Sequence, residues 1–162
     1  MSTRELTRIA LIAAIATVLS LFKVFQMPQG GSITLYLFPL YIAVANEKLR
    51  NCFFVGLVVS ILQMLLGGQM TNLFSGLFDY IIPVVAIVTC GMFKQNIYVN
   101  IAIGSIIALA SYTLSGMIFW QTPFVASLTY NATYFIPTVI VNVIIFALAN
   151  VQISKAYKTI NN

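Results

Sequence analysis

The sequence predicts an all-α integral membrane protein, a bundle of six transmembrane helices with both termini in the cytoplasm. Three observations predict this fold class. Of the 162 residues, 60% are hydrophobic and only 7% are charged, whereas soluble domains average roughly 45–50% apolar and about 25% charged residues. The chain also divides into six apolar segments, and its basic residues lie at alternate ends of these segments. The length is that of one domain, which we expect to cover residues 1–162.

Six apolar segments define the expected helices, because a spanning helix needs about 20 mostly apolar residues, within a range of about 17–25. The first segment follows Arg4 and Arg8 but lacks the small-residue cleavage site of a signal peptide, so we interpret it as a span. The second and third segments are short, and the charged turn 46–50 between them indicates two separate helices. The segments cover approximately residues 9–25, 33–46, 51–66, 73–93, 97–120 and 133–153.

The basic residues predict which side of the membrane holds each loop. An even number of spans places both termini on one side, and cytoplasmic loops carry an excess of Lys and Arg. With the termini inside, only Lys23 lies outside. The inner side then holds Arg4, Arg8, Lys48, Arg50, Lys94, Lys155 and Lys158. Topology therefore explains the net charge of +5, and we expect no nucleic-acid partner.

The three expected outer loops cover residues 26–32, 67–72 and 121–132. They carry no charge and are rich in Gly, Gln, Asn, Thr and Pro. Uncharged, partly irregular loops suit the mouth of a solute-binding pocket. The alternative, that they only connect helices, stays open.

Few residues are available for catalysis. The chain has no histidine, and its only acids are Glu5, Glu47 and Asp79. A carboxylate pair inside the membrane needs two acids, and only Asp79 falls within an apolar segment. Cys52 and Cys90 have no CxxC spacing and are typical of small core residues. We therefore expect no catalytic residue, metal site or cofactor, and any ATP hydrolysis must come from a partner because no phosphate-binding loop is present.

Asp79 lies within the fourth segment, where an ionisable side chain costs about 2.5–3.5 kcal/mol on insertion scales. It must therefore face a cavity or a partner, and no Lys or Arg is expected deep in another segment. A carboxylate that binds a cationic or hydrogen-donating solute explains this position. A structural acid near the outer interface is the alternative. The six-span topology puts Asp79 in the outer half, which favours a pocket open to the outside.

Further candidates lie near the outer ends of the fifth and sixth segments. Trp120 is the only tryptophan, and it is either an interfacial anchor or a stacking platform for a flat or cationic ring. Tyr130, Asn131 and Tyr134 lie at the start of the sixth segment. Asn131 offers two donors and an acceptor, which suits the edge of a heterocycle. The tyrosines fit an interfacial belt equally well.

The first segment is expected to carry a face of small residues, formed by Ala10, Ala13, Ala14 and Ala16. Ala10 and Ala14 are four residues apart and therefore share one face of a helix. Small faces let helices approach closely. This face either packs inside the protein or docks another membrane subunit.

Taken in order, these features resemble the thiamine-specific substrate-binding (S) components of energy-coupling factor (ECF) transporters, over about residues 6–153. The order and spacing of several short stretches carry the likeness, each of which is weak alone. These stretches are Pro28–Thr34 with Pro39, Phe78–Tyr80 with Gly91–Phe93, Ser115–Trp120 and Tyr130–Asn131. The Ala10 and Ala14 face resembles the family's docking motif for its coupling protein.

The resemblance implies a six-helix bundle with a ligand pocket near its outer face. By this likeness, Asp79 and Tyr80 contact the ligand from the fourth span, with Asp in place of the more usual Glu. Trp120 matches a tryptophan that stacks on the ligand. Asn131 matches an asparagine that hydrogen-bonds the pyrimidine.

The sequence also departs from the family pattern. A basic residue and a histidine one turn apart are replaced by Ala108 and Tyr112, and a tyrosine ahead of the asparagine is replaced by Ala126. Tyr112 remains able to stack on a ligand, so we count Tyr112 and Tyr130 among the substrate-binding candidates. Losing a basic residue should increase the preference of Asp79 for a positive ligand.

We therefore expect a protein of the bacterial plasma membrane that performs no covalent chemistry. It would bind thiamine with high affinity from outside the cell, as the S component of an ECF-type ABC importer. Its partners would be a transmembrane coupling protein and two ABC ATPases. Two alternatives stay open: an S component for another small vitamin or pyrimidine precursor, and a ligand-free membrane assembly protein.

Overall fold

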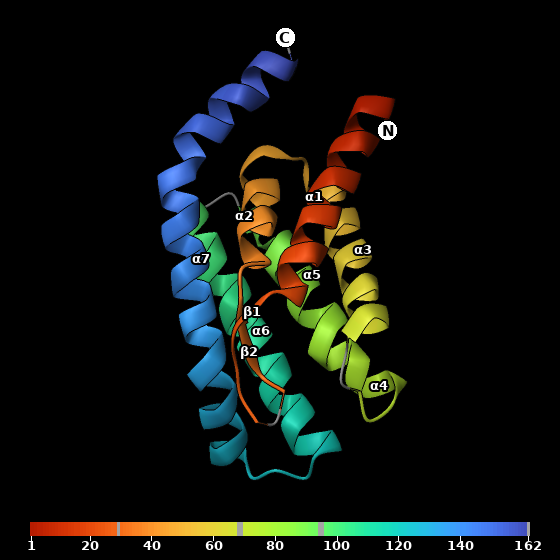
Figure 1. Cartoon of the computed structure of the whole chain (residues 1–162), viewed down its shortest axis with the longest axis vertical. Coiled ribbons are helices and arrows are strands. Elements are labelled where there is room, and N and C mark those ends of the chain that lie inside the picture. Colours follow the sequence, from red (N-terminus) through yellow and green to blue (C-terminus); the bar gives the residue numbers. More distant parts are fainter. Residues whose placement is uncertain (29, 68–69, 94–95, 162) are drawn as a thin grey trace.

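The computed structural model describes residues 1–28, 30–67, 70–93 and 96–161. Gln29 of the Pro28–Thr34 stretch and Lys94 of the inner basic set lie outside the described residues. The protein is an elongated bundle of helices whose two termini lie at the same end (Figure 1). The helices are α1 Thr3–Leu21, α2 Leu37–Asn46, α3 Leu49–Gly67, α4 Leu73–Gly76, the π-helical turn η1 Leu77–Ile81, α5 Ile82–Thr89, the 3-10 turn η2 Cys90–Phe93, α6 Ile97–Phe119 and α7 Phe124–Asn161.

Four helical stretches among the described residues are long and apolar enough to cross a membrane. They are Leu49–Leu66, Leu73–Met92, Ile97–Phe119 and Phe124–Ile153. The ten-residue α2 is apolar but shorter, and α1 is not in this group. The coarser prediction, a mainly helical membrane protein, is therefore confirmed.

The first expected span, 9–25, was wrong at both ends. α1 begins directly after Ser2, whose hydroxyl accepts a hydrogen bond from the Glu5 N–H at 3.2 Å, while the Glu5 carboxylate accepts one from the Ser2 N–H at 3.0 Å. This capping box satisfies two N–H groups that a helix start leaves free. After Leu21 the chain leaves the helix and forms strand β1, Lys23–Gln26.

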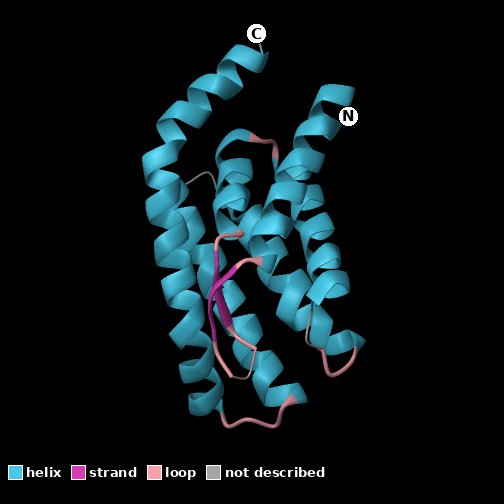
Figure 2. Cartoon of the chain, viewed as in Figure 1, coloured by secondary structure: helices cyan, strands magenta, loops and turns pink. Residues whose placement is uncertain are grey.

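Strand β1 pairs antiparallel with β2, Ser32–Thr34, to form a small hairpin alongside the helices (Figure 2). The expected loop 26–32 thus includes the turn of this hairpin at residues 27, 28, 30 and 31, while its end residues Gln26 and Ser32 belong to the strands. Val24 and Phe25 are residues that favour strands, and Gly30 adopts a positive φ of 97° in the turn between them and β2, a conformation open to glycine at little cost. Alternation of apolar residues was too short here to separate a strand from the end of a helix.

The last expected span, 133–153, also began too late, since α7 starts at Phe124. Most of the expected loop 121–132 is helix. Its polar residues obscured the helical pattern, but they bond inside the bundle rather than to water. The Ser127 hydroxyl, for example, donates to the Thr113 carbonyl of α6 at 2.9 Å.

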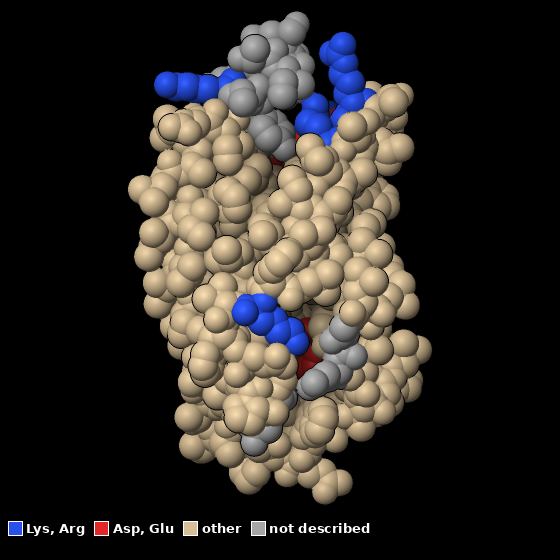
Figure 3. All heavy atoms as spheres, in the orientation of Figure 1, with Lys and Arg blue, Asp and Glu red and all other residues tan. Residues whose placement is uncertain are grey.

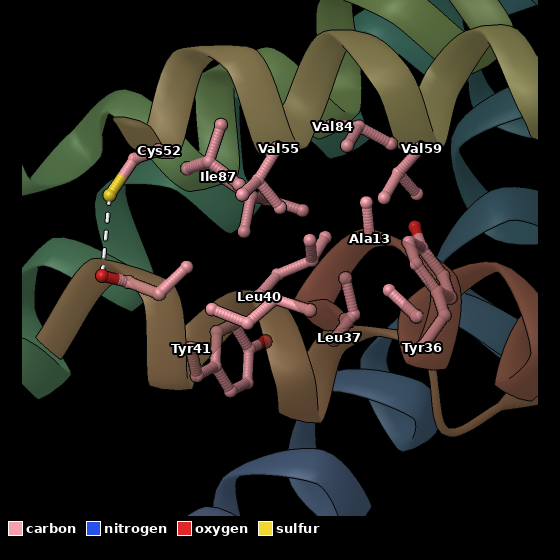
Figure 4. Close-up of a cluster of buried hydrophobic side chains, with 14 of the residues drawn as sticks. Ala13, Tyr36, Leu37, Leu40, Tyr41, Cys52, Val55, Val59, Val84 and Ile87 are labelled. Carbon is pink, nitrogen blue, oxygen red and sulfur yellow. Dashed lines mark hydrogen bonds between the residues drawn. The ribbon is translucent and has the colours of Figure 1, made fainter. Parts of the chain in front are cut away.

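The core lies where α1, α2, α3 and α5 meet (Figure 4). Leu40 of α2 packs there among side chains of the other three helices. The labelled core side chains include Ala13, Leu37, Leu40, Tyr41, Val55, Val59, Val84 and Ile87. The Cys52 thiol lies at the edge of this cluster and donates to the Ala43 carbonyl at 3.3 Å, as expected of a small core residue.

A charged cluster joins α1 to the α2–α3 turn at the end that carries the termini. Arg8 Nε donates to Glu47 Oε1 at 2.6 Å, and the Glu47 side chain is only 2% exposed. Lys48 and Arg50 contact the Glu5 carboxylate at 3.2 and 3.8 Å. The backbone N–H of Ser2, together with Lys48, lowers the pKa of Glu5. On the face shown in Figure 3, basic side chains gather at this end.

Candidate functional site

A cavity of about 970 Å³ lies between the hairpin, η1, α6 and α7. It is in the half of the molecule away from the termini, where Figure 3 shows a hollow with acidic atoms inside and a basic side chain beside it. Its polar and aromatic lining includes Lys23, Tyr36, Gln63, Asp79, Tyr80, Tyr112, Ser115, Trp120, Ser127, Tyr130, Asn131 and Tyr134. Helices from opposite ends of the sequence thus contribute to one site.

The π-helical turn η1 carries Asp79 and Tyr80 to the cavity. The Ile82 N–H bonds to the Leu77 carbonyl, five residues back rather than four. Such turns occur mostly as single interruptions of α-helices and frequently at functional sites. Asp79 is half-buried, so the protein shields it partly from bulk water. Because Asp79 lines the cavity, a solute in the cavity can still reach it.

Tyrosine rings form much of the wall opposite η1. Tyr112 lies 5.2 Å from Phe135 and 6.4 Å from Tyr134, measured between ring centroids. Tyr130 lies 5.6 Å from Tyr134, and the hydroxyl oxygens of Tyr36 and Tyr112 are 3.4 Å apart. Aromatic faces of this kind attract cations and stack on flat rings.

The hairpin closes one side of the cavity because it is attached to α7. The Gly31 N–H donates to the Tyr130 hydroxyl at 2.9 Å, and a Cβ at Gly31 would collide with the Tyr134 ring. Asn142 adds a second attachment, donating to the Thr34 carbonyl and accepting from the Phe38 N–H, both at 2.8 Å. Only glycine fits against the tyrosines at position 31.

The amide of Asn131 is engaged within the protein. Its Nδ2 donates to the carbonyls of Ser127 at 2.9 Å and Tyr112 at 3.3 Å. Its Oδ1 accepts from the Tyr134 hydroxyl at 2.7 Å, and the residue is 7% exposed. Asn131 lines the cavity, but its hydrogen bonds hold α6, α7 and the Tyr134 ring together.

Lys23 is a lining residue that the sequence did not single out. Among the described residues that line the cavity, Lys23 is the only base and Asp79 the only acid. Lys23 reaches the site from strand β1, after the end of α1, and it is exposed. It does not lie deep in a helix, so it leaves the expectation that no Lys or Arg lies deep in another segment unchanged.

The sequence matches the family described as thiamine transporter protein over residues 6–158. The chain belongs to the thiamine transporter family. A curated relative, the thiamine transporter ThiT of Bacillus subtilis strain 168, is 30% identical over an alignment of 174 residues that covers 89% of this chain and 88% of ThiT.

The fold of this family member is also that of a solved structure of ThiT from Listeria monocytogenes. The two structures agree with a TM-score of 0.81, over 94% of this chain and 96% of the other, at 21% sequence identity. The family membership confirms the resemblance seen in the sequence. It makes the chain a transport component for thiamine rather than an enzyme, and a multi-pass membrane protein.

In this thiamine transporter all six predicted substrate-binding side chains line the cavity. They are Asp79, Tyr80, Tyr112, Trp120, Tyr130 and Asn131. Trp120 is 60% exposed at the end of α6. At the two departures from the family pattern, Ala108 is buried and Ala126 is an exposed lining residue.

The four alanines of α1 do not share one face. Ala10 and Ala14 are exposed, whereas Ala13 and Ala16 are buried in the core. The pair that resembles the family's docking motif therefore lies on the outer surface of α1. Consecutive residues of a helix point about 100° apart, so Ala13 faces the core while Ala14 faces away from it.

Sequence reasoning missed Lys23, Tyr36 and Ser115 as lining residues. Ser115 was noted only as part of the Ser115–Trp120 stretch. No pattern in the sequence distinguishes a serine that faces a cavity from one that faces a neighbouring helix. Lys23 was missed because the hairpin that positions it was expected to be helix and loop.

Proposed function

We propose that this thiamine transporter binds thiamine in the cavity described above, as the S component of an ECF-type ABC importer. The observation that supports the proposal most is a single carboxylate, Asp79, in a cavity walled by tyrosines and bordered by Trp120. The cavity volume of about 970 Å³ lies within the roughly 300–1,000 Å³ typical of small-molecule sites.

The chemistry of thiamine fits this lining. Thiamine joins an aminopyrimidine to a thiazolium ring that carries a permanent positive charge. The Asp79 carboxylate attracts that charge in a partly water-excluded site, where attraction is stronger than in bulk water. The faces of Tyr112, Tyr130 and Trp120 provide stacking and cation–π contact.

Six helical segments would span the membrane, with both termini in the cytoplasm. The two termini lie at one end (Figure 1), together with Arg4, Arg8, Lys48 and Arg50, and an excess of basic residues marks the cytoplasmic side. The cavity lies toward the opposite end and would open to the outside of the cell. α1 and α2 would complete the six spans by packing against the four longer helical stretches.

The partners would be a transmembrane coupling protein and two ABC ATPases. Ala10 and Ala14 support this part of the proposal because both are exposed on α1. Small exposed side chains let a partner helix approach the α1 backbone closely. We assign the docking of the coupling protein to this face.

The first test is a thiamine titration of the purified protein in detergent, followed by the fluorescence of Trp120. Because Trp120 is the only tryptophan, any change in the signal arises at the cavity. We expect saturable quenching at nanomolar to low micromolar thiamine. Calorimetry on the Trp120→Phe variant gives an independent measure of binding without the reporter.

The same titration separates the alternatives. Binding of another vitamin or of a pyrimidine precursor, with no response to thiamine, would overturn the thiamine assignment but keep an S component. No response to any vitamin or pyrimidine, by fluorescence or calorimetry on folded protein, would favour a ligand-free assembly protein.

A further inference from the structure

We propose that Ser115 is a specificity-determining residue that, together with Asp79, reads the amino edge of the thiamine pyrimidine. The inference rests on the proposed function. It assigns a donor and an acceptor to one edge of the ligand: the Ser115 hydroxyl donates to the ring nitrogen, and the Asp79 carboxylate accepts from the neighbouring amino group.

The Ser115 hydroxyl is buried at the cavity wall without a hydrogen-bond partner. Ser115 is 1% exposed and lines the cavity. Among the residues that the structure describes, none lies in hydrogen-bonding geometry to its Oγ. A buried hydroxyl without a partner costs free energy comparable to a lost hydrogen bond. A ligand in the cavity that accepts a hydrogen bond from Ser115 would remove that cost.

Ser115 and Asp79 lie near each other although they come from different elements. Ser111, one turn before Ser115 on α6, bonds to the carbonyl of Phe78, the residue that precedes Asp79 on η1, and Ser115 and Asp79 both line the cavity. The two side chains therefore offer a hydroxyl donor and a carboxylate acceptor side by side. An aminopyrimidine presents the complementary pair, a ring nitrogen acceptor next to an amino donor.

Asn131 is less available for the same task. Its amide donors bond to carbonyls of α6 and α7, and its oxygen accepts from Tyr134. Binding a pyrimidine edge through this amide would require these bonds to rearrange, whereas the Ser115 hydroxyl has no partner in hydrogen-bond geometry among the described residues. We therefore assign the amino edge of the pyrimidine to Ser115 and Asp79, while the hydrogen bonds of Asn131 also hold the tyrosine wall in position.

Ser115→Ala tests the assignment, with Ser105→Ala as its matched control. Ser105 is also a buried serine of α6 whose hydroxyl lacks a hydrogen-bond partner among the described residues, but it does not line the cavity. Affinities for thiamine, pyrithiamine and a thiamine analogue with a C–H in place of the ring nitrogen beside the amino group are measured by calorimetry. Pyrithiamine keeps the aminopyrimidine and replaces the thiazolium by a pyridinium ring, while the C–H analogue keeps the amino group and loses only the ring acceptor.

We expect Ser115→Ala to lower the affinity for thiamine and pyrithiamine by about three- to tenfold, the value of one hydrogen bond. The C–H analogue has no hydrogen-bonding group at that ring position, so its weaker binding should change by less than about twofold. The empty Ser115→Ala protein should also unfold at a higher temperature, because a buried hydroxyl without a partner is removed. Ser105→Ala should share the higher melting temperature and keep all three affinities.

Three results would overturn the inference. They are unchanged thiamine affinity in Ser115→Ala, an equal loss for thiamine and the C–H analogue, or a loss for thiamine with none for pyrithiamine. Failure of the unmodified protein to bind thiamine would instead overturn the proposed function. The two failures are thus distinguishable in one set of titrations.

Discussion

The hydroxyl of Ser111 donates a hydrogen bond of 2.7 Å to the carbonyl oxygen of Phe78. Phe78 lies in η1, immediately before Asp79. Its carbonyl lacks a helical donor for two reasons: the Ile82 N–H bonds to Leu77 instead, and residue 83, the next candidate, is a proline without an N–H. Ser111 of α6 supplies the missing donor and ties the π-helical turn to the cavity wall.

Ser111→Ala should therefore weaken thiamine binding although Ser111 does not line the cavity. The Phe78 carbonyl would lose its donor, and η1 would hold Asp79 less firmly. We expect about a three- to tenfold loss in affinity, equivalent to one hydrogen bond, measured by calorimetry. Thr113→Val is the matched control, because the Thr113 hydroxyl bonds within its own helix, to Leu109 at 2.8 Å. Equal affinities in the two variants would contradict a positioning role for Ser111.

Asp79→Asn should weaken thiamine by more than about tenfold, on the order of 1.4 kcal/mol. The amide keeps a hydrogen-bond acceptor but removes the negative charge that attracts the thiazolium ring. A neutral aminopyrimidine without the thiazolium should lose less than about threefold, since only the acceptor matters for it. An unchanged dissociation constant for thiamine would remove Asp79 from the binding site.

Gly31→Ala should speed the release of thiamine. The new methyl group collides with the Tyr134 ring, and overpacking of this kind costs about 1–3 kcal/mol, which displaces the hairpin from α7. Stopped-flow fluorescence of Trp120 should show release faster by about tenfold on this scale. Tyr130→Phe removes only the hydrogen bond to Gly31 and should give a smaller increase, about threefold. Identical release rates in all three proteins would show that the hairpin does not retain the ligand.

Ala14→Trp should abolish assembly with the coupling protein and leave thiamine binding intact. The large side chain would block close approach to the exposed face of α1, and Ala14 does not line the cavity. Co-purification of the complex measures assembly, and calorimetry measures binding. Ile144→Trp on α7 is the control, because Ile144 is also exposed (54%) but lies on another helix. Normal co-purification of Ala14→Trp would place the docking surface elsewhere.

Glu47→Gln should lower the free energy of unfolding by about 2–4 kcal/mol, because it removes the buried negative charge that Arg8 contacts at 2.6 Å. The matched variant Glu5→Gln should change stability little, since its partner Lys48 is mostly exposed to solvent and exposed ion pairs contribute little. Thermal unfolding in detergent measures both. If Glu5→Gln lowers the free energy of unfolding more than Glu47→Gln does, the Arg8–Glu47 pair is not the main stabilising contact of the charged cluster.

Several properties followed from the sequence because they depend on composition and local periodicity. The apolar content required a membrane protein, and the segments 51–66, 73–93 and 97–120 agree closely with α3, the Leu73–Met92 stretch and α6. Asp79 had to face a cavity, since an ionisable group cannot lie against lipid without a large cost. The aromatic candidates Tyr112, Trp120 and Tyr130 came instead from the resemblance to thiamine-specific S components.

Only the tertiary structure decided how these groups meet. The hairpin that brings Lys23 beside the cavity depends on α7, whose tyrosines fix Gly31 across 99 residues of sequence. The engagement of Asn131, the missing partner of Ser115 and the bond from Ser111 to Phe78 all depend on the packing of α6 against its neighbours. Hydrogen bonds between segments distant in the chain leave no local pattern, so a sequence can present these side chains but cannot show which of them are already paired.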